Sequence, residues 1–417
     1  MRLLFVTPLY WPDASGATRL LQGYAESLAA RGHSVEVWTT DAAENHSLYS
    51  PGAARASGHG TVHEGVRVRR FRLWHPRDKS RSFSRGFRLP WPGSGYIFDS
   101  PHVASLQLQR AAAFSPVPCD MVVAGYLPFT SFIHAGFVLS RRRKVPFVVL
   151  PLLHLGEPGD HSLLSSFGRP LQRRILHHAD LLLANTEVEA AALKRWGIEP
   201  RRIAIVGAGI EPDALKDGVP SRFRKRYGLQ HPIVFQISTQ THDKGSHHLV
   251  EAMKQVWASG IEAHLILAGR ALPDFDDYLS HQPKEVFERL ICTGHLSEES
   301  KLDLLAAGDV MVMLSRAESF GIAYLEAWWY GKPVVGCYAG ALPAMIWDGV
   351  DGFLVPFADV HMLVETLRSL LTKPDLRARL GEAGRSKVRS SFLWKQRMDR
   401  LDRALCLVDD RRRRCTG

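Results

Sequence analysis

The sequence predicts an α/β protein made of two doubly wound domains of about 200 residues each. Two series of short apolar strands alternate with amphipathic segments, and a break with prolines at positions 212 and 220 separates them. The length of 417 residues is enough for two or three domains. Domains of this type that face each other bind ligands in the cleft between them. We therefore expect domains at 1–212 and 213–388.

The first β-α-β unit is visible at the amino end. Residues 2–6 form an apolar run, and apolar residues then recur at helical spacing from Ala17 to Leu28. Gly32 stands where such a helix should end, and residues 34–39 alternate like a strand. A strand, a helix and a second strand in this order predict a parallel sheet.

The remaining strands follow the same pattern. We expect them at 120–124, 146–150, 180–184, 203–206, 233–237, 264–268, 290–293, 310–314 and 334–337. Residues 41–100 are rich in Arg, Gly, Ser and Pro and lose the regular pattern, so we expect them to depart from the sheet.

Composition excludes several classes of protein. Hydrophobic residues make up 45% and charged residues 23%, which is ordinary for a globular protein. Five cysteines without a C-x-x-C pair argue against a disulfide framework and favour a reducing, cytoplasmic location. Residues 121–140 carry no charge and could span a bilayer, but their Gly, Pro and polar residues favour a strand, a turn and a helix. Pro8 breaks the first apolar run too early for a signal peptide.

The net charge of +11 is concentrated in the amino half. Residues 1–211 hold 25 Lys and Arg against 16 Asp and Glu, and the rest of the chain holds 28 against 26. Anionic partners such as phosphates, acidic lipid or nucleic acid would suit this half.

The most informative segment is 317–327, Ala-Glu-Ser-Phe-Gly-Ile-Ala-Tyr-Leu-Glu-Ala. It joins a predicted strand to a helix that begins near Gly321, and free amides at a helix start favour a phosphate. Glu318 precedes the helix and Glu326 lies about one and a half turns into it. The pair suits a hydroxyl-rich ligand, with one carboxylate for a sugar and one for a ribose. The alternative is a solvated glutamate beside a partner of the helix dipole.

The E-x7-E spacing with Ser-Phe-Gly after the first glutamate, followed by Gly-Lys-Pro-Val-Val at 331–335, resembles family 4 glycosyltransferases. The motifs at 28–35, 180–186 with 209–211, and 351–355 are similar to further motifs of that family, so the resemblance covers most of the chain except 41–100. It implies a retaining, nucleotide-sugar-dependent enzyme with two Rossmann-like domains in the GT-B fold, the last helix (about 389–410) returning to the first domain.

The resemblance also implies the donor site. Glu318 should contact the donor sugar, and Glu326 should contact the ribose. Lys244 in Lys244-Gly245 should bind the diphosphate and stabilise the leaving group, and Gly16 should let the first loop approach it. Without the resemblance, Lys244 could equally be a solvated lysine at a helix start.

Two further parts of the site are implied in the same way. The amides near Phe320, Gly321 and Ile322 should hold donor hydroxyls and phosphate. His154 matches the active-site histidine of the family, although alone it would more often be a core histidine. Ser238 and Thr239 stand where the family often has an arginine, so the leaving-group charge falls to Lys244, to backbone dipoles or to an arginine from elsewhere.

We therefore expect transfer of a hexose from a UDP- or GDP-sugar to an acceptor hydroxyl in envelope glycan, polysaccharide or glycolipid synthesis. We expect no metal and no cofactor: the acidic cluster at 274–277 is interpreted as a surface feature, and the adjacent His pairs lack ligand spacing. A nucleotide-sugar epimerase of the same fold is the alternative. A non-catalytic basic protein that binds nucleic acid would explain the charge but not the glutamate pair and Lys244.

Residues 67–88 hold nine Lys and Arg and one Asp, with four aromatic residues between them. Cations are attracted to an anionic leaflet and aromatic rings favour its interface. We expect a peripheral enzyme at the cytoplasmic face of a membrane with a lipid-linked or other glycan acceptor. A solvated basic loop and nucleic-acid binding remain alternatives here.

Overall fold

The computed structural model describes residues 1–13, 15–50, 52–56, 60–74, 103–157 and 164–416. The chain forms two compact units. The first contains residues 1–153, 164–207 and 398–417, and the second contains 154–163 and 208–397. Helix α17 (Trp394–Thr416) begins in the second unit and continues in the first.

The first unit is built on an eight-stranded sheet in the order β3-β4-β2-β1-β5-β6-β7-β8. Its neighbouring strands are parallel except β3 and β4, which are antiparallel. The strands are β1 (Arg2–Val6), β2 (Ser34–Thr40), β3 (Thr61–His63), β4 (Val66–Phe71), β5 (Met121–Gly125), β6 (Phe147–Leu150), β7 (Leu181–Ala184) and β8 (Ile203–Ile205).

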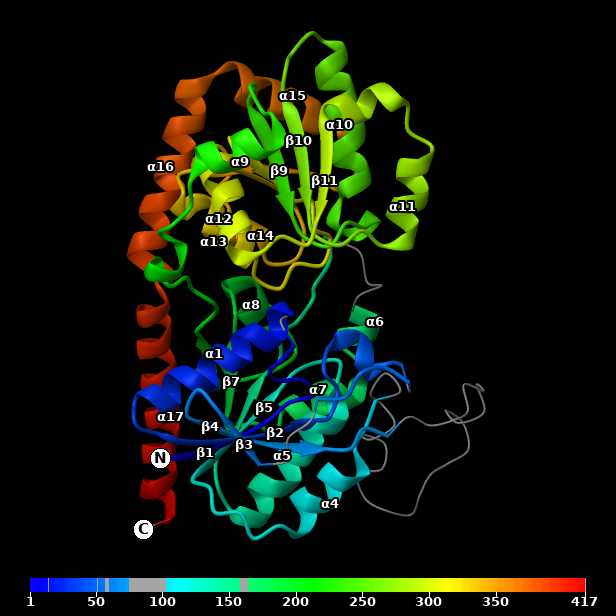
Figure 1. Ribbon diagram of the computed structural model, residues 1–417. Helices are drawn as coiled ribbons and strands as arrows, with labels where there is room; N and C mark the ends of the chain where they lie inside the picture. Colours follow the sequence, from blue (N-terminus) through cyan, green and yellow to red (C-terminus); the bar gives the residue numbers. More distant parts are fainter. Residues whose placement is uncertain (14, 51, 57–59, 75–102, 158–163, 417) are drawn as a thin grey trace. The chain divides into compact units, whose positions relative to one another are not determined.

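Helices cover both faces of this sheet. They are α1 (Gly16–Ala30), α4 (Leu106–Phe114), α5 (Thr130–Arg143), α6 (Leu164–Phe167), α7 (Pro170–Leu176) and α8 (Glu187–Arg195). Helix α1 lies on one face, and α4 and α5 lie on the other (Figure 1). Leu20, Leu21, Tyr24 and Leu28 of α1 are buried, as their helical spacing predicts.

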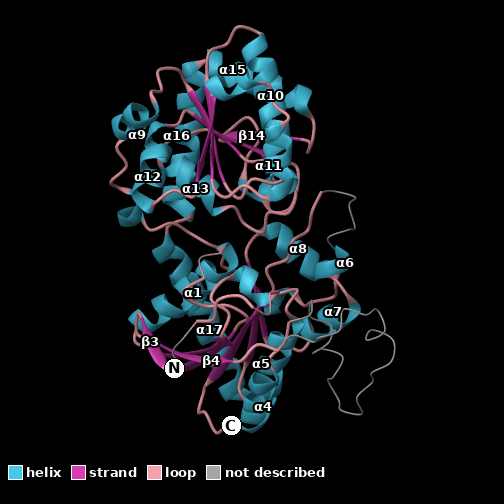
Figure 2. Ribbon diagram, turned by 45° about the vertical axis from the view of Figure 1, so that its right-hand side comes forward, coloured by secondary structure: helices cyan, strands magenta, loops and turns pink. Residues whose placement is uncertain are grey.

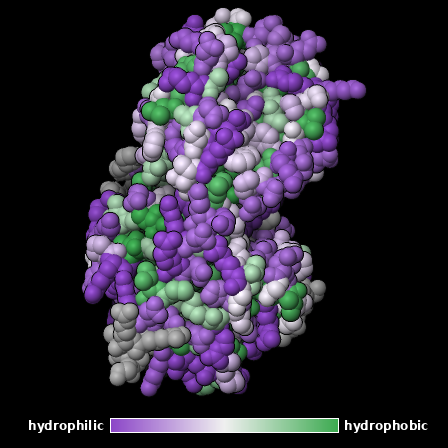
Figure 3. Space-filling model, turned by 90° about the vertical axis from the view of Figure 1, so that its left-hand side faces the viewer, coloured by the Kyte–Doolittle hydropathy of each residue, from purple (hydrophilic) through white to green (hydrophobic). Residues whose placement is uncertain are grey.

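The uncharged stretch at 121–140 forms strand β5, a turn and most of helix α5, which confirms the sequence interpretation. None of the helices in the described ranges is both long enough and apolar enough to cross a bilayer. On the face shown in Figure 3, hydrophilic side chains predominate and hydrophobic ones appear in small separate groups.

The expectation that residues 41–100 depart from the sheet is wrong for two segments. Strand β4 pairs in parallel with β2, and β3 extends the sheet beside it. The arginines of β4 hid the pattern because they do not all face water. Arg69 lies over the rings of Trp38 and Phe71 at 5.2 and 5.0 Å, and Arg70 is buried. The basic stretch from 75 to 88, with Phe83 and Phe87, lies outside the described residues.

The second unit contains a parallel six-stranded sheet in the order β11-β10-β9-β12-β13-β14. Its strands are β9 (Ile233–Ile237), β10 (His264–Ala268), β11 (Leu290–Gly294), β12 (Val310–Val312), β13 (Val334–Cys337) and β14 (Gly352–Val355). Each strand expected in this half is present, although β12 ends two residues early.

Both faces of the second sheet are also covered (Figure 2). The helices are α9 (Pro220–Tyr227), α10 (Ser246–Ala258), α11 (Pro273–Ser280), α12 (Glu298–Ala307), α13 (Ile322–Trp329), α14 (Leu342–Met345), α15 (Val360–Thr372) and α16 (Pro374–Ser391). Helices α10 and α11 lie on one side of the sheet, and α12 and α13 on the other.

The strand order reverses direction between β9 and β12. From β9 the chain moves outward to β10 and β11, then returns to the other side of β9 as β12. In open α/β sheets, ligands bind outside the carboxyl ends of the strands at such a switch point. The loops after β9 and β12 are therefore the first place to look for a functional site.

Candidate functional site

An ion pair joins the two loops at the switch point. Lys244 ends the loop after β9, and its Nζ lies 3.1 Å from Oε2 of Glu318 in the loop after β12. The same ammonium donates a hydrogen bond to Oγ of Ser315, at 2.9 Å. Ser315 is buried and directly follows the apolar run at 310–314, a position that could have marked it in the sequence.

Gly245 lets the two loops approach this closely. It adopts a left-handed conformation, with φ of +70°, between the 3-10 turn His242–Lys244 and helix α10. A Cβ atom at this position would lie 2.5 Å from Cβ of Leu314. Because only glycine avoids this clash and the strain of a positive φ, the Lys-Gly pair has a structural reason as well as a chemical one.

The carboxylate of Glu318 is largely shielded from solvent. Its side chain is 15% exposed, and burial by itself would raise the pKa of the carboxyl group. The Lys244 ammonium, the nearby His154 and the Phe320 amide outweigh this cost, and the pKa lies below its ordinary value. Glu318 is thus an ionised acceptor at neutral pH, as a residue that binds hydroxyl groups should be.

His154 belongs to the same unit and lies near this ion pair. Its Nδ1 donates to the carbonyl oxygen of Ala317, at 2.8 Å, so the proton of a neutral imidazole stays on Nδ1 and Nε2 carries the lone pair. Burial lowers the pKa of His154, against the opposing effects of the Ala317 bond and of Glu318. The structure therefore brings together three of the expected residues, His154, Lys244 and Glu318.

Helix α13 begins four residues after Glu318 in the chain. Gly321 is the N-cap, with φ of +96°, and Ile322 is the first helical residue. The Phe320 amide donates to Oε1 of Glu318 over a long 3.5 Å. The predicted helix start and the predicted glutamate thus form one turn, which can present amides and a carboxylate side by side.

Glu326 has a different partner. It lies in α13 and pairs with Lys301 of α12, Nζ to Oε1, at 3.1 Å. Lys301 also pairs with Glu298, at 2.9 Å, and the side chains of Lys301 and Glu326 are both 14% exposed. Burial acts to lower the pKa of Lys301, but the two glutamates raise it overall. Sequence reasoning missed Lys301, whose only signal is its i, i+3 spacing from Glu298.

The positions of the missing arginine hold no cation. Thr239 is exposed, and the Ser238 hydroxyl donates to the Thr239 carbonyl at 3.1 Å. An arginine does lie close in sequence to Glu318. Arg316 pairs through Nε with Glu157 at 2.8 Å, and its Nη1 is 3.6 Å from Asp243. It therefore ties the segment after His154 to the loop that carries Lys244, a role that the sequence alone did not suggest.

Two sequence predictions concern parts of the chain outside the Lys244–Glu318 site, namely Gly16 and the acidic cluster at 274–277. Gly16 is the first residue of α1 in the first unit, and a Cβ atom there would meet nothing within 4 Å. The acidic cluster at 274–277 opens helix α11, and all three aspartates are exposed there, as expected. Across the described ranges, no three His, Cys, Asp or Glu side chains gather as metal ligands.

The chain matches two family models that follow one another. Residues 15–209 match the model described as a glycosyl transferase 4-like domain, and residues 221–387 match glycosyl transferases group 1. The second match contains Lys244, Glu318 and Glu326.

Characterised relatives share parts of the sequence. An alpha-D-kanosaminyltransferase of Streptomyces kanamyceticus is 28% identical over 279 residues, which is 65% of this chain and 68% of that protein. A GDP-mannose-dependent monoacylated alpha-(1-6)-phosphatidylinositol monomannoside mannosyltransferase of Corynebacterium glutamicum is 31% identical over 194 residues. This second match covers 44% of this chain and half of the relative.

Solved structures share the fold over nearly the whole chain. Anabaena HepE, solved in complex with UDP and glucose, aligns with a TM-score of 0.70 at 19% identity, covering 97% of this chain and 99% of that one. Sucrose-phosphate synthase from Thermosynechococcus elongatus aligns with a TM-score of 0.71, also at 19% identity, covering 98% and 99%. The two family models, which together span most of the chain, show that it belongs to the family 4 glycosyltransferases, and the solved structures show that it has the GT-B fold.

Proposed function

We propose that this glycosyltransferase moves a hexose from a UDP- or GDP-sugar to an acceptor hydroxyl and retains the anomeric configuration. The observation that carries the proposal is the Lys244–Glu318 ion pair at the switch point of the second sheet, with His154 beside it. A cation for a diphosphate and an ionised carboxylate for a sugar stand together where the fold collects ligands.

Each residue has a role in this proposal. Lys244 binds the diphosphate, and Glu318 accepts hydrogen bonds from sugar hydroxyls. The amides at Phe320 and Ile322 and the Gly321 turn face donor oxygens. Glu326 exchanges part of its contact with Lys301 for the ribose hydroxyls, and Gly16 in the first unit lets the loop after β1 approach the diphosphate.

The chemistry needs no covalent intermediate on the protein. The bond from the anomeric carbon to the diphosphate oxygen breaks, and the acceptor oxygen forms a new bond on the same face of the sugar. The acceptor proton passes to the departing diphosphate, which keeps the charges balanced. Lys244 stabilises the developing negative charge, and such electrostatic stabilisation is usually the largest catalytic contribution. We propose that no metal takes part.

The names of the relatives support the donor class. One relative depends on GDP-mannose and acts on a phosphatidylinositol mannoside, and HepE was solved with UDP and glucose. Both nucleotides carry a diphosphate, which is the group that Lys244 suits. We infer for this chain a donor of this class and a glycan or lipid-linked acceptor.

Binding and products together test the proposal. A thermal-shift panel of UDP- and GDP-sugars should give one donor that raises the melting temperature, because a ligand that binds only the folded state stabilises it. With that donor and an acceptor extract, the product should keep the anomeric configuration on NMR. Conversion of the donor without any acceptor would favour an epimerase instead, and an inverted product would overturn the retaining assignment.

We also propose that the first unit docks on an anionic membrane surface at the cytoplasmic face. Helix α4 exposes Leu106 and Phe114, at 50% and 71%. Arg110 and Phe114 line a hollow of about 520 Å³ together with Arg69 of β4, and Arg142 lies 5.6 Å from the Phe114 ring. Exposed apolar side chains among arginines are the composition that anionic lipid attracts.

A further inference from the structure

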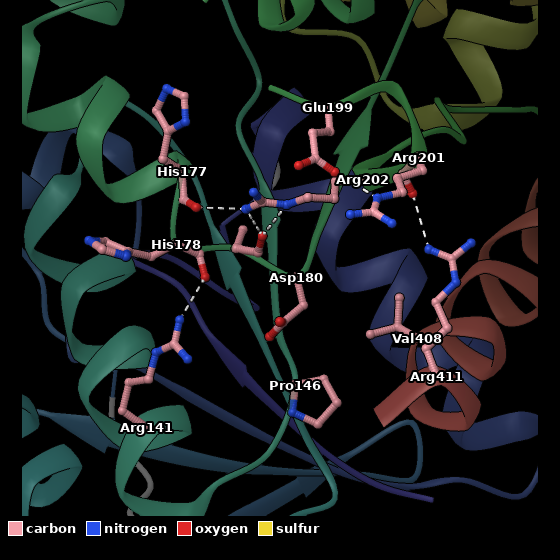
Figure 4. A pocket seen from close by; sticks show the side chains of 11 residues that line it. Arg141, Pro146, His177, His178, Asp180, Glu199, Arg201, Arg202, Val408 and Arg411 are labelled. Carbon is pink, nitrogen blue, oxygen red and sulfur yellow. Dashed lines mark hydrogen bonds and ion pairs between the residues drawn. The ribbon is translucent and has the colours of Figure 1, made fainter. Parts of the chain in front are cut away.

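The first unit has a basic hollow at the amino ends of β6, β7 and β8. Pro146, Asp180 and Arg202 each directly precede one of these strands and line it (Figure 4). Arg141 of α5 and Arg411 of α17 complete its rim. The hollow has a volume of about 760 Å³, and all of its lining residues belong to the first unit. Lys244 and Glu318 belong to the second unit, and neither lines this hollow.

Cations outnumber anions in this hollow. Four arginines (Arg141, Arg201, Arg202 and Arg411) stand against two carboxylates (Asp180 and Glu199), which leaves a formal charge of +2 with neutral histidines. One carboxylate is already engaged, because Asp180 accepts a hydrogen bond from the Phe147 amide at 2.8 Å. The lining therefore favours a ligand with two negative charges.

Backbone carbonyls hold the arginines in place. Arg202 donates to the carbonyls of Ala179 and His177, at 2.9 and 2.7 Å. Arg141 donates to the His178 carbonyl at 3.2 Å, and Arg411 to the Arg201 carbonyl at 3.3 Å (Figure 4). A guanidinium has five N–H donors, and Arg141 and Arg411 each use one in these bonds. Their remaining donors can bind oxyanions without leaving these positions.

The lowered pKa of a histidine that lines the hollow reflects the same excess of positive charge. His178 lines the hollow and stacks on Phe137, with ring centroids 4.8 Å apart. Burial lowers the pKa of His178, and the charges of Arg141, Arg174 and Arg202 lower it further. The neighbouring cations thus oppose a further positive charge at this point, as they would attract a negative one.

We propose that this basic hollow is a second anion site, which binds a phosphomonoester or diphosphate group of a ligand distinct from the sugar donor. Arginine forks match phosphate oxygens and bind them through paired hydrogen bonds. A volume of about 760 Å³ lies within the range of pockets for small ligands, so the occupant can be larger than free phosphate. The group could belong to a dissolved metabolite or to a lipid headgroup, and the two sources are separable by experiment.

Pyrophosphate titrated into the full-length protein by calorimetry tests the site. The donor site also suits a diphosphate, so the titration is run in Lys244→Ala protein. Replacing both Arg141 and Arg411 by Ser in that background should weaken pyrophosphate binding at least tenfold. The matched control is Arg195→Ser, which removes an exposed arginine of α8 outside the hollow and should leave the affinity unchanged.

A charge change of opposite sign distinguishes anion binding from simple stabilisation of the fold. Glu199 pairs with Arg201 at 2.6 Å, and its side chain is 53% exposed. Glu199→Gln raises the charge of the hollow and releases Arg201, so it should tighten pyrophosphate binding severalfold at low salt. A structural role alone would give no such gain, and an unchanged affinity in both Glu199→Gln and the double arginine variant would overturn the proposal.

Vesicle flotation identifies the source of the phosphate. If the ligand is a lipid headgroup, vesicles that contain phosphatidic acid, whose headgroup is a phosphomonoester, should bind the Arg195→Ser control more tightly than the double arginine variant, and pyrophosphate should remove that difference. If it is a dissolved ligand, the double substitution should affect pyrophosphate binding alone. If neither pyrophosphate binding nor vesicle binding depends on Arg141 and Arg411, the proposed site is refuted.

Discussion

Nζ of Lys244 lies 3.1 Å from Oε2 of Glu318, although 73 residues separate the two in the chain. The contact exists because β9 and β12 are neighbours in the sheet, so the loops after them meet at one edge. It lowers the pKa of a carboxyl group that burial alone would raise. Lys244 and Glu318 thus place a cation and an anion side by side where we propose that a charged sugar donor binds.

Lys244→Ala should lower kcat by about 10²-fold or more at saturating donor, because a group that stabilises the leaving charge acts mainly in the transition state. Lys254→Ala is the matched control, since Lys254 lies in the following helix and pairs with Glu251. Steady-state kinetics of both variants measures whether kcat falls only in Lys244→Ala. Near-normal kcat in Lys244→Ala would show that another cation or the backbone carries the leaving-group charge.

Substitution of Glu326 and substitution of Glu318 should have different effects, the first on nucleoside diphosphate binding and the second on turnover. Glu326→Ala should weaken binding of the nucleoside diphosphate by about 1–3 kcal/mol, the size of a lost hydrogen bond to a charged group. Glu318→Ala should spare that binding and lower turnover. Calorimetry and kinetics measure the two effects, and Glu298→Ala controls for the loss of a Lys301 partner. Equal losses of diphosphate affinity in both variants would reject the division of roles.

Gly245→Ala should reduce turnover more than its loss of stability explains. The new Cβ would clash with Leu314 and move the loop that carries Lys244. Gly228→Ala is a matched control, because Gly228 has a similar φ of +66° and open space around its Cβ position. Both variants should lose on the order of 1 kcal/mol from backbone strain. Retained activity in Gly245→Ala would mean that the two loops can adjust.

His134 should make the protein sensitive to acid. Burial lowers its pKa to about 4, whereas a histidine in the unfolded chain titrates near 6.5. Between these values the unfolded state binds more protons, so the free energy of unfolding falls as pH drops below about 6.5. The loss from His134 should reach about 2 kcal/mol at pH 5.

Urea unfolding at pH 7 and pH 5 measures this effect. His134→Gln should lose less stability between the two pH values than the wild-type protein. His281→Gln should lose as much as wild type, because His281 is exposed. An equally steep loss in His134→Gln would assign the acid sensitivity to other groups.

Membrane binding should depend on α4 and its neighbouring arginines. Arg72 is exposed, and its backbone amide donates to Oε1 of Gln107 in α4 at 3.1 Å. Replacing Arg72, Arg110 and Phe114 by Ser should reduce flotation with anionic vesicles, and binding of the wild-type protein should weaken as salt rises. Arg70 is left unchanged because it is buried. Lys225→Ser with Arg379→Ser, two exposed cations of the second unit, serves as the control. A wild-type protein that stays in the soluble fraction at low salt would contradict the membrane proposal.

The sequence by itself determined the α/β class, most strands, the helix start after Glu318 and the family. Strand periodicity and glycine positions are local signals, so they can be read without knowing what packs against them. It failed at β4, where Arg69 packs on aromatic rings and Arg70 is buried, because the partners of these arginines come from elsewhere in the chain.

Only the tertiary structure decided which charges meet. The Glu326–Lys301 and Arg316–Glu157 pairs join segments with no common sequence signal, and the basic hollow gathers arginines from α5, from the 3-10 turn before β8 and from α17. Contacts of this kind depend on strand order and helix packing, which fix distances between residues far apart in the chain. A local pattern contains no such distances, and for that reason Lys244 and Glu318 could be identified singly from the sequence but paired only in the fold.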